Sequence, residues 1–168
     1  MGETGILAPD ARVELIEGKI IDMTPIGSSH AGTVARVCRL LGTAAGNSAI
    51  VWPQNPIILG NNSAPQPDVT LLRPREDFYT ASHPRPEDLL LLVEVADTTL
   101  QIDRTVKARL YATAGIVEYW IVDLERRTIA IGREPHNGEY RAIVSVTGTE
   151  TLTVQSLPAV SFTVSAIF

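Results

Sequence analysis

An acidic residue interrupts the most hydrophobic stretch of the chain. Glu94 follows the run Leu89–Val93 and is itself followed by Val95. A carboxylate inside a buried strand loses its hydration, which costs several kcal/mol unless a cation or hydrogen-bond donors compensate. Packing gives no reason for this residue. Glu94 therefore either forms a salt bridge at the end of a sheet, with Arg104 or Arg109, or belongs to a functional site, and we favour the site.

Asp68 is the natural partner of Glu94. It begins a predicted strand over residues 68–72, directly after Pro67, which fixes the entry of the chain. If that strand pairs with residues 89–95, the two carboxylates meet at one end of the sheet. Carboxylate oxygens suit Mg²⁺ or Mn²⁺, with water and a substrate phosphate as further ligands. The alternative for Asp68 is the capping of a turn, a common role for aspartate.

Lys107 is the third candidate for this site. It lies on a predicted helix over residues 103–114, roughly 90° from the centre of an apolar stripe. The stripe consists of Ile102, Val106, Leu110 and Thr113. From this position a lysine could reach along the sheet to the carboxylates, where an ammonium group orients or activates water and stabilises charge on a phosphate. The alternative is an ordinary solvated lysine.

Two short motifs resemble a nuclease signature. Pro67-Asp68 and Glu94-Val95-Ala96 are similar to the two halves of the PD-(D/E)XK motif, although Ala96 stands where that motif has its lysine. Longer blocks resemble the Uma-type family of restriction-endonuclease-like proteins, over roughly residues 12 to 133. These blocks are residues 14–18, 54–56, 65–69, 94–97, 103–107 and 115–123.

The resemblance implies an endonuclease-like fold whose lysine has moved from the acidic strand to the helix that follows it. In this sequence that position is Lys107. The resemblance thus implies a metal-dependent nuclease with Asp68 and Glu94 as metal ligands and Lys107 completing the catalytic site.

Three further residues could support the site. Glu14 lies in the middle of a predicted strand, in a block shared with the family, and could line the site or contact its ligands. Gln66 is close to Asp68 and could contact substrate. His30 stands at the start of a predicted helix, where it could face a phosphate, although a plain surface position is the commoner role for such a histidine.

Other kinds of active site are not supported. Ser28 and Ser29 have no companion histidine and aspartate pattern, so no hydrolase triad is indicated. The three histidines lack zinc-ligand spacing, and no glycine-rich phosphate loop is present. Cys38 is the only cysteine, which excludes an intramolecular disulfide and a zinc–thiolate cluster and favours a reducing cytoplasm. We expect Cys38 to be a small buried apolar residue.

The predicted elements form one mixed α/β domain over residues 1–168. A hairpin turns at residues 17–19, and a helix runs from Ser28 or Ser29 to Gly46. Residues 52–59 form edge strand or extended chain because of their prolines, and residues 73–88 an exposed connection. Further strands are predicted at residues 68–72, 89–96, 119–122, 128–131, 140–146, 151–154 and 162–167. The expected fold is a restriction-endonuclease-like core: a mixed central sheet flanked by helices, with additional antiparallel strands at the N- and C-terminal ends.

Composition sets limits on the partners. The 168 residues are 45% hydrophobic and 20% charged, as in a soluble globular protein. No apolar run approaches the roughly 18 residues that span a bilayer, and no signal peptide is indicated. The net charge of −5 counts against a simple nucleic-acid-binding module. Basic residues could still cluster locally, Arg73 with Arg75 and Lys107 with Arg104 and Arg109.

Three hypotheses follow. The first is an endonuclease that uses Mg²⁺ or Mn²⁺ to hydrolyse DNA. The second is a catalytically inactive protein that keeps the endonuclease fold and binds a partner, and the third is a metal-dependent hydrolase of a smaller phosphate ester. By analogy with many endonuclease folds we expect a homodimer, since so short a chain has little surface with which to read a DNA site.

Overall fold

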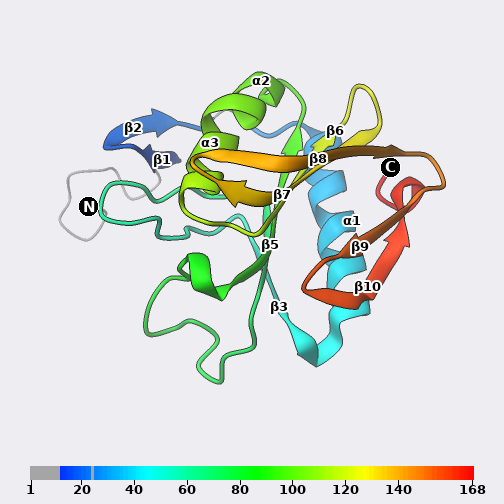
Figure 1. Cartoon of the computed structure of the whole chain (residues 1–168), viewed down its shortest axis with the longest axis horizontal. Helices are drawn as coiled ribbons and strands as arrows, with labels where there is room; N and C mark the ends of the chain where they lie inside the picture. The colour runs from blue at the N-terminus through cyan, green and yellow to red at the C-terminus, as the bar shows by residue number, and fades with distance from the viewer. Residues whose placement is uncertain (1–11, 24) are drawn as a thin grey trace.

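A six-stranded mixed sheet forms the centre of the molecule. The computed structural model describes residues 12–23 and 25–168 (Figure 1). The strand order is β3-β4-β5-β6-β7-β8, in which only the β5–β6 pairing is parallel. The strands span Ile50–Pro53 (β3), Val69–Leu72 (β4), Leu89–Ala96 (β5), Glu118–Asp123 (β6), Thr128–His136 (β7) and Glu139–Thr147 (β8). Strands β4, β5 and β6 are buried on both faces, as the continuous apolar run of residues 89–93 predicts.

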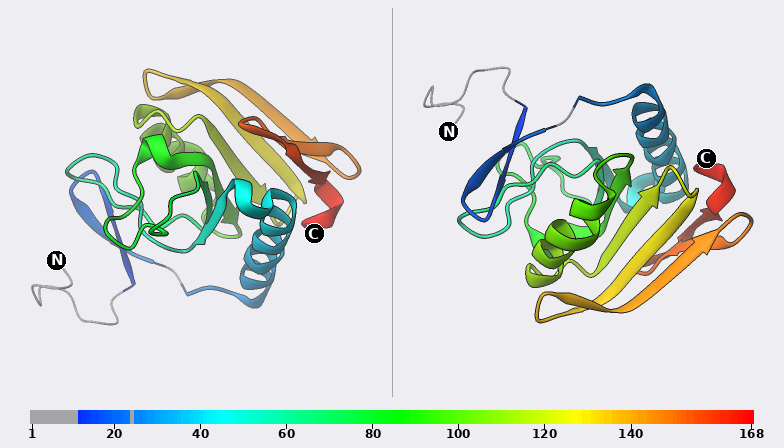
Figure 2. Two further views of the ribbon diagram at one scale, coloured as in Figure 1. Left: turned by 90° about the horizontal axis from the view of Figure 1, so that it is seen from below. Right: turned by 90° about the horizontal axis from the view of Figure 1, so that it is seen from above.

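The parallel pairing of β5 with β6 requires a crossover connection. One helical segment makes it, in three parts: α2 (Leu100–Ile102), a π-helical turn η3 (Asp103–Lys107) and α3 (Ala108–Thr113). The opposite face of the sheet is covered by the long helix α1 (Ser28–Ala45) and by the hairpin of β9 (Thr151–Val154) with β10 (Leu157–Thr163) (Figure 2). No helix within the described residues combines the length and hydrophobicity needed to cross a bilayer.

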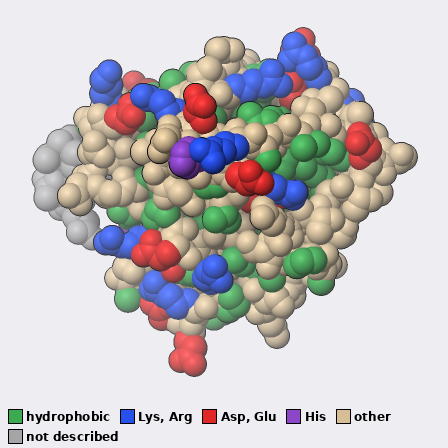
Figure 3. All heavy atoms as spheres, viewed as in Figure 1, with side chains coloured by type: hydrophobic (Ala, Val, Ile, Leu, Met, Phe, Trp, Pro, Cys, Tyr) green, Lys and Arg blue, Asp and Glu red, His purple; other side chains and the backbone are tan. Residues whose placement is uncertain are grey.

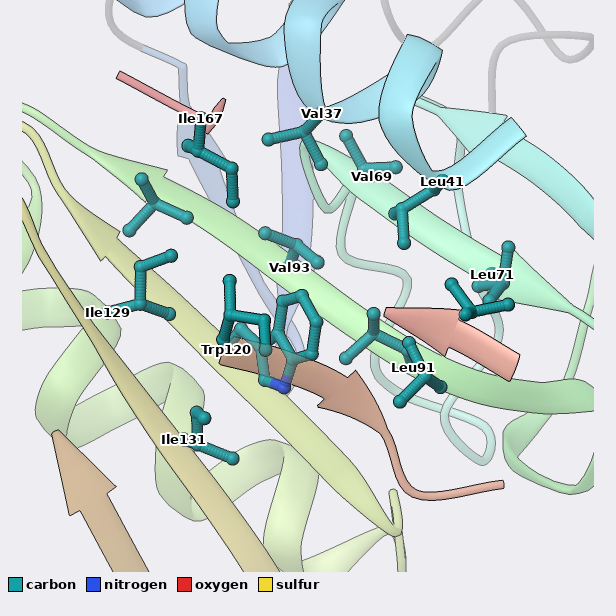
Figure 4. Packing of buried hydrophobic residues seen from close by; sticks show 14 of the residues in the cluster. Val37, Leu41, Val69, Leu71, Leu91, Val93, Trp120, Ile129, Ile131 and Ile167 are labelled. Carbon is teal, nitrogen blue, oxygen red and sulfur yellow. The ribbon is translucent and has the colours of Figure 1, made fainter. Parts of the chain in front are cut away.

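The larger core lies between the sheet and α1. Val37 and Leu41 of α1 pack on Leu91 and Val93 of β5 and on Trp120 of β6, and all five side chains are fully buried (Figure 4). Trp120 is therefore a core residue, as predicted. Cys38 is only partly buried and packs at the edge of this cluster, so its expected full burial is wrong.

Tyrosines dominate the core on the other face of the sheet. Tyr111 of α3 meets Tyr119 of β6 edge to face, with their ring centroids 5.1 Å apart. The Tyr119 hydroxyl donates a hydrogen bond of 3.1 Å to the backbone oxygen of Asp103. The crossover helix is thus fixed to the sheet both by ring packing and by a buried hydrogen bond to its own backbone.

The N-terminal hairpin lies outside the central sheet. Its strands β1 (Val13–Ile16) and β2 (Lys19–Asp22) pair around Glu17 and Gly18, which have φ values of 49° and 79°. Positive φ at both turn residues is the geometry of a tight hairpin, and it confirms the predicted turn. The hairpin is held to the molecule partly by backbone hydrogen bonds between Leu15 and Ala64.

The C-terminal end differs from the prediction. The last strand ends at Thr163 and is followed by the 3₁₀ turn η4 (Val164–Ala166), so the expected strand over residues 162–167 is wrong beyond its first two residues. Val164 and Ile167 are both fully buried in one core. A spacing of three residues places side chains on one side of a 3₁₀ turn but on opposite faces of a strand. Two further 3₁₀ turns of the same length are η1 (Gly46–Ser48) and η2 (Pro86–Asp88).

Gly132 of β7 offers a direct test of the packing on the tyrosine-rich face. A Cβ atom at this position would lie 2.9 Å from Cγ of Tyr140, closer than side-chain carbons approach. We expect Gly132→Ala to destabilise the protein by about 1–3 kcal/mol in urea unfolding, because Tyr140 must move. Gly32→Ala in α1 is the control: no atom lies within 4 Å, so we expect about 0.5–1 kcal/mol of stabilisation. An unchanged urea midpoint in Gly132→Ala would contradict the packing.

Candidate functional site

Asp68 directly precedes β4, one residue before the strand begins, and lies opposite Glu94 of the neighbouring strand β5. Strands β4 and β5 are antiparallel, and Val69 pairs with Val93. The next pair along this register is Asp68 with Glu94, so the predicted meeting of the two carboxylates occurs. Glu94 shares its face of β5 with Leu92 and Ala96, which is the face covered by the crossover helix.

One oxygen of Asp68 is held by protein donors. Its Oδ2 accepts a hydrogen bond of 2.8 Å from the backbone N–H of Val95 and lies 3.1 Å from Nε2 of His30. The Oδ1 atom has only a long contact of 3.4 Å with Nε2 of Gln54. Asp68 therefore has a fixed orientation and one oxygen that remains available to a ligand.

Glu94 is buried among donors from the crossover helix. Its side chain is 4% exposed, and its Oε1 accepts hydrogen bonds from Nζ of Lys107 (3.0 Å) and from the hydroxyl of Tyr111 (2.6 Å). The two arginines considered as salt-bridge partners of Glu94 do not contact it, because Arg104 pairs with Asp123 and Arg109 pairs with Glu17. Burial raises the pKa of Glu94 to about 8, although the charge of Lys107 opposes this shift.

Lys107 faces the carboxylates, as the sequence suggests. Besides Glu94, its Nζ lies 3.4 Å from Oε1 of Glu14 and 4.0 Å from Oδ1 of Asp103. Burial lowers the pKa of Lys107, but these three carboxylates outweigh burial and raise it above its usual value. Lys107 is therefore a charged ammonium group at neutral pH, and it can donate hydrogen bonds but cannot accept a proton.

The helix presents only part of the predicted face to the sheet. Val106 and Leu110 of the expected apolar stripe pack in the tyrosine-rich core, but Ile102 and Thr113 are exposed, and the segment begins at Leu100 instead of Asp103. The buried row is Asp103, Lys107 and Tyr111, spaced four residues apart. Two facts explain the difference in orientation. A π-helical turn rotates the part of the helix that follows it, and apolar periodicity does not identify polar side chains that are buried because they pair with other polar groups.

Glu14 and Gln66 connect the N-terminal hairpin to the site. Glu14 of β1 is 7% exposed, and its Oε1 accepts a hydrogen bond of 2.8 Å from the backbone N–H of Gln66. The side-chain amide of Gln66 donates in turn to the backbone oxygen of Val13 at 3.0 Å. Gln66 lines the site, but its amide is engaged in holding the hairpin.

His30 is not a plain surface residue. Its side chain is 15% exposed and contacts Asp68, and the hydrogen bond to Asp68 raises its pKa against the effect of burial. Its Nδ1 is buried without a hydrogen-bond partner within the described residues. The first turn of α1 thus delivers a donor that orients Asp68.

Asp103 and Tyr111 belong to the site but were missed by the sequence reasoning. Asp103 is 1% exposed, and its Oδ2 accepts a 2.6 Å hydrogen bond from the hydroxyl of Thr99. Its Oδ1 has no hydrogen-bond partner in the part of the chain that the structure describes. The four-residue spacing of Asp103, Lys107 and Tyr111 is the signal that could have revealed both residues.

These side chains form the floor of a cleft of about 370 Å³. The first turn of α1, the hairpin β1–β2, the C-terminal end of β5 and the crossover helix make its walls. The floor carries four carboxyl groups beside the single ammonium group of Lys107, those of Glu14, Asp68, Glu94 and Asp103. With Glu94 protonated at neutral pH, the other three still outnumber this ammonium group. This excess of negative charge favours a cation in the cleft.

The donor set fits a hard divalent cation. Asp68 and Glu94 each have one carboxylate oxygen bound by protein donors, and the other oxygen of each could bind a metal. Within residues 12–23 and 25–168, no group of three or more His, Cys, Asp or Glu side chains is arranged as a metal site. Mg²⁺ needs no such group, since it is commonly held by one or two carboxylates with waters and substrate phosphate.

Comparison with known proteins shows the family to which the chain belongs. The model of the Uma2 family, described as "Putative restriction endonuclease", matches residues 4–165. The chain belongs to the Uma2 family. No curated protein sequence matches it.

The Uma2 fold is also found in a solved structure. A crystal structure from Anabaena variabilis ATCC 29413, described as "a putative nuclease belonging to DUF820", superposes with a TM-score of 0.73. The match covers 93% of this chain and 89% of the other at 14% sequence identity, so it shows the shared fold. The expected endonuclease-like α/β fold is confirmed, and family and fold together support a nuclease function.

The buried carboxyl of Glu94 gives a pH prediction for the metal-free protein. Its pKa rises from 4.5 to about 8 on folding, so between these values the folded protein binds a proton that the unfolded chain releases. The free energy of unfolding should therefore fall as pH rises through this window, by at most about 1.4 kcal/mol per pH unit. Glu94→Gln removes this dependence, so we expect the variant to gain stability relative to wild type between pH 5 and pH 8.

Urea unfolding at four pH values would measure this difference. Glu125→Gln, the same substitution at an exposed site, should stay parallel to wild type. A constant difference between wild type and Glu94→Gln across the window would contradict the prediction.

Proposed function

We propose that this Uma2 protein is an endonuclease that hydrolyses DNA phosphodiester bonds with Mg²⁺ or Mn²⁺. One observation carries the proposal: Asp68 and Glu94 converge from adjacent strands, and Nζ of Lys107 lies 3.0 Å from Oε1 of Glu94. Two carboxylates beside a buried ammonium group are the parts that metal-assisted phosphodiester hydrolysis requires.

Each residue has a separate role in this proposal. Asp68 and Glu94 hold the cation, which supplies Lewis-acid chemistry at the phosphate when bound. Lys107 remains charged, so it orients the attacking water and stabilises negative charge that develops on the phosphate, but does not remove a proton. Glu14 and Asp103 hold the ammonium group in place, and His30 orients Asp68.

The geometry of the site also bears on the two alternative functions, an inactive interaction protein and a hydrolase of a smaller phosphate ester. An inactive interaction protein has no need to keep a buried, desolvated carboxylate aimed into a cleft. A hydrolase of a smaller phosphate ester is the second candidate, because a cleft of about 370 Å³ could hold a mononucleotide. Turnover of mononucleotide esters without cleavage of polymers would favour this second candidate.

Cleavage of supercoiled plasmid and of single-stranded DNA with Mg²⁺ or Mn²⁺ tests the proposal. We expect metal-dependent cleavage by wild type, and at least about a 100-fold loss in Asp68→Asn, Glu94→Gln and Lys107→Met. Glu125→Gln is the matched control and should cleave as wild type does. Circular dichroism would establish that each variant is folded.

Metal binding provides a second measurement. Mn²⁺ should raise the melting temperature of wild type and leave that of Asp68→Asn unchanged, because the ligand is lost. Full cleavage by folded Asp68→Asn and Glu94→Gln would refute the assignment of the site.

We further propose that the protein acts in the cytoplasm as a homodimer. The lone Cys38 fits a reducing compartment. A second copy would double the surface that can contact DNA. Sedimentation at assay concentrations should give twice the mass of the chain, and a monodisperse monomer would refute the dimer.

A further inference from the structure

The mouth of the cleft is apolar, in contrast to its floor. Ile21 of β2 and Ile102 of α2 line the cleft and are 40% and 51% exposed. Ile21 pairs with Glu14 across the hairpin, so its side chain lies on the face that carries Glu14 into the site. Met23 and Ile26 continue this wall toward the first turn of α1. Large exposed apolar side chains beside a reactive site indicate a surface that a ligand covers.

The same cleft has almost no positive charge to offer a polyanion. Lys107 and His30 are its basic residues, and both are engaged by carboxylates. Six carboxylates line it, those of Glu14, Asp22, Asp68, Glu94, Asp97 and Asp103. On the face of the molecule drawn in Figure 3, acidic and basic side chains are interspersed and form no continuous basic tract.

This charge pattern discriminates between forms of DNA. Duplex DNA carries one phosphate for about every 1.7 Å of its axis, and proteins hold it largely through contacts to those phosphates. Here the two arginines of the crossover helix are paired, Arg104 with Asp123 and Arg109 with Glu17. A single strand carries half as many phosphates per unit length and exposes the faces of its bases, whose apolar surface can be buried against apolar side chains.

We propose that the cleft accepts DNA whose bases are unpaired, with a base packed on the wall of Ile21 and Ile102 and its phosphate at the cation that Asp68 and Glu94 would hold on the floor. The proposal deepens, and rests on, the proposed nuclease function. Oδ1 of buried Asp103 lines the cleft without a hydrogen-bond partner among the described residues, with Nζ of Lys107 4.0 Å away, and this is a second indication that a bound cation or water completes the floor. An intact duplex has its base faces stacked inside and cannot cover the apolar wall.

Substrates of one sequence in three forms test the inference. We would compare a labelled single strand, the fully paired duplex, and a duplex with a central unpaired bubble, each with Mn²⁺. The single strand and the bubble should be cleaved at least about tenfold faster than the duplex, with cuts confined to unpaired positions. Ile102→Ala should raise KM for the single strand about fivefold with little change in kcat, since it removes apolar contact and no catalytic group. Ile143→Ala, at an isoleucine of β8 that is 68% exposed and lies outside the cleft, is the control.

A DNA-binding measurement distinguishes failure of the preference for unpaired DNA from failure of the proposed nuclease function. Fluorescence anisotropy with Ca²⁺ in place of Mn²⁺ should show tighter binding of the single strand than of the duplex, weakened by Ile102→Ala. Glu94-dependent cleavage of duplex and single strand at equal rates would overturn the inference and leave the nuclease proposal intact. If no substrate is cleaved, the nuclease proposal fails, and equal binding of the two forms would then overturn the inference as well.

Discussion

The ammonium group of Lys107 is the point on which three parts of the molecule converge. Glu14 comes from the N-terminal hairpin, Glu94 from the central sheet and Asp103 from the crossover helix itself, and all three carboxylates lie within 4.0 Å of the same nitrogen. Removing one partner of a buried ion pair costs more than the pair contributes, because the remaining charge is left without compensation. The hairpin, which has no strand pairing with the central sheet, is thus held against the sheet and helix by the same charge that would serve the chemistry.

The two proposed metal ligands share a pattern. Asp68 uses Oδ2 and Glu94 uses Oε1 for hydrogen bonds with the protein, and the second oxygen of each is left to other partners. This arrangement fixes the direction of each carboxylate before any cation binds. A ligand that is already oriented loses little conformational entropy on binding, which matters for side chains that hold a small cation in a defined geometry.

Much of the fold and the centre of the site could be predicted from the sequence. The apolar run around Glu94 and the turn at Glu17-Gly18 are local patterns that the structure retains, and the predicted strand pairing brings Asp68 close to Glu94. Apolar periodicity predicted only Val106 and Leu110 of the face that the crossover helix buries. Its inner row is Asp103, Lys107 and Tyr111, polar residues that are buried only because strands distant in sequence supply their partners. His30 was misjudged for the same reason, since its partner Asp68 lies 38 residues away.

The single parallel strand pair has a consequence for how the protein is made. Asp103 is anchored through its backbone oxygen to Tyr119, and Glu94 lies beside β6, so both depend on a strand that follows them in the chain. Parallel pairing across a helix is a non-local contact that forms late in folding. Until β6 is in place, the crossover helix has no strand to anchor its backbone. The carboxyl groups and Lys107 are therefore held in one frame only once the chain has been made beyond Asp123.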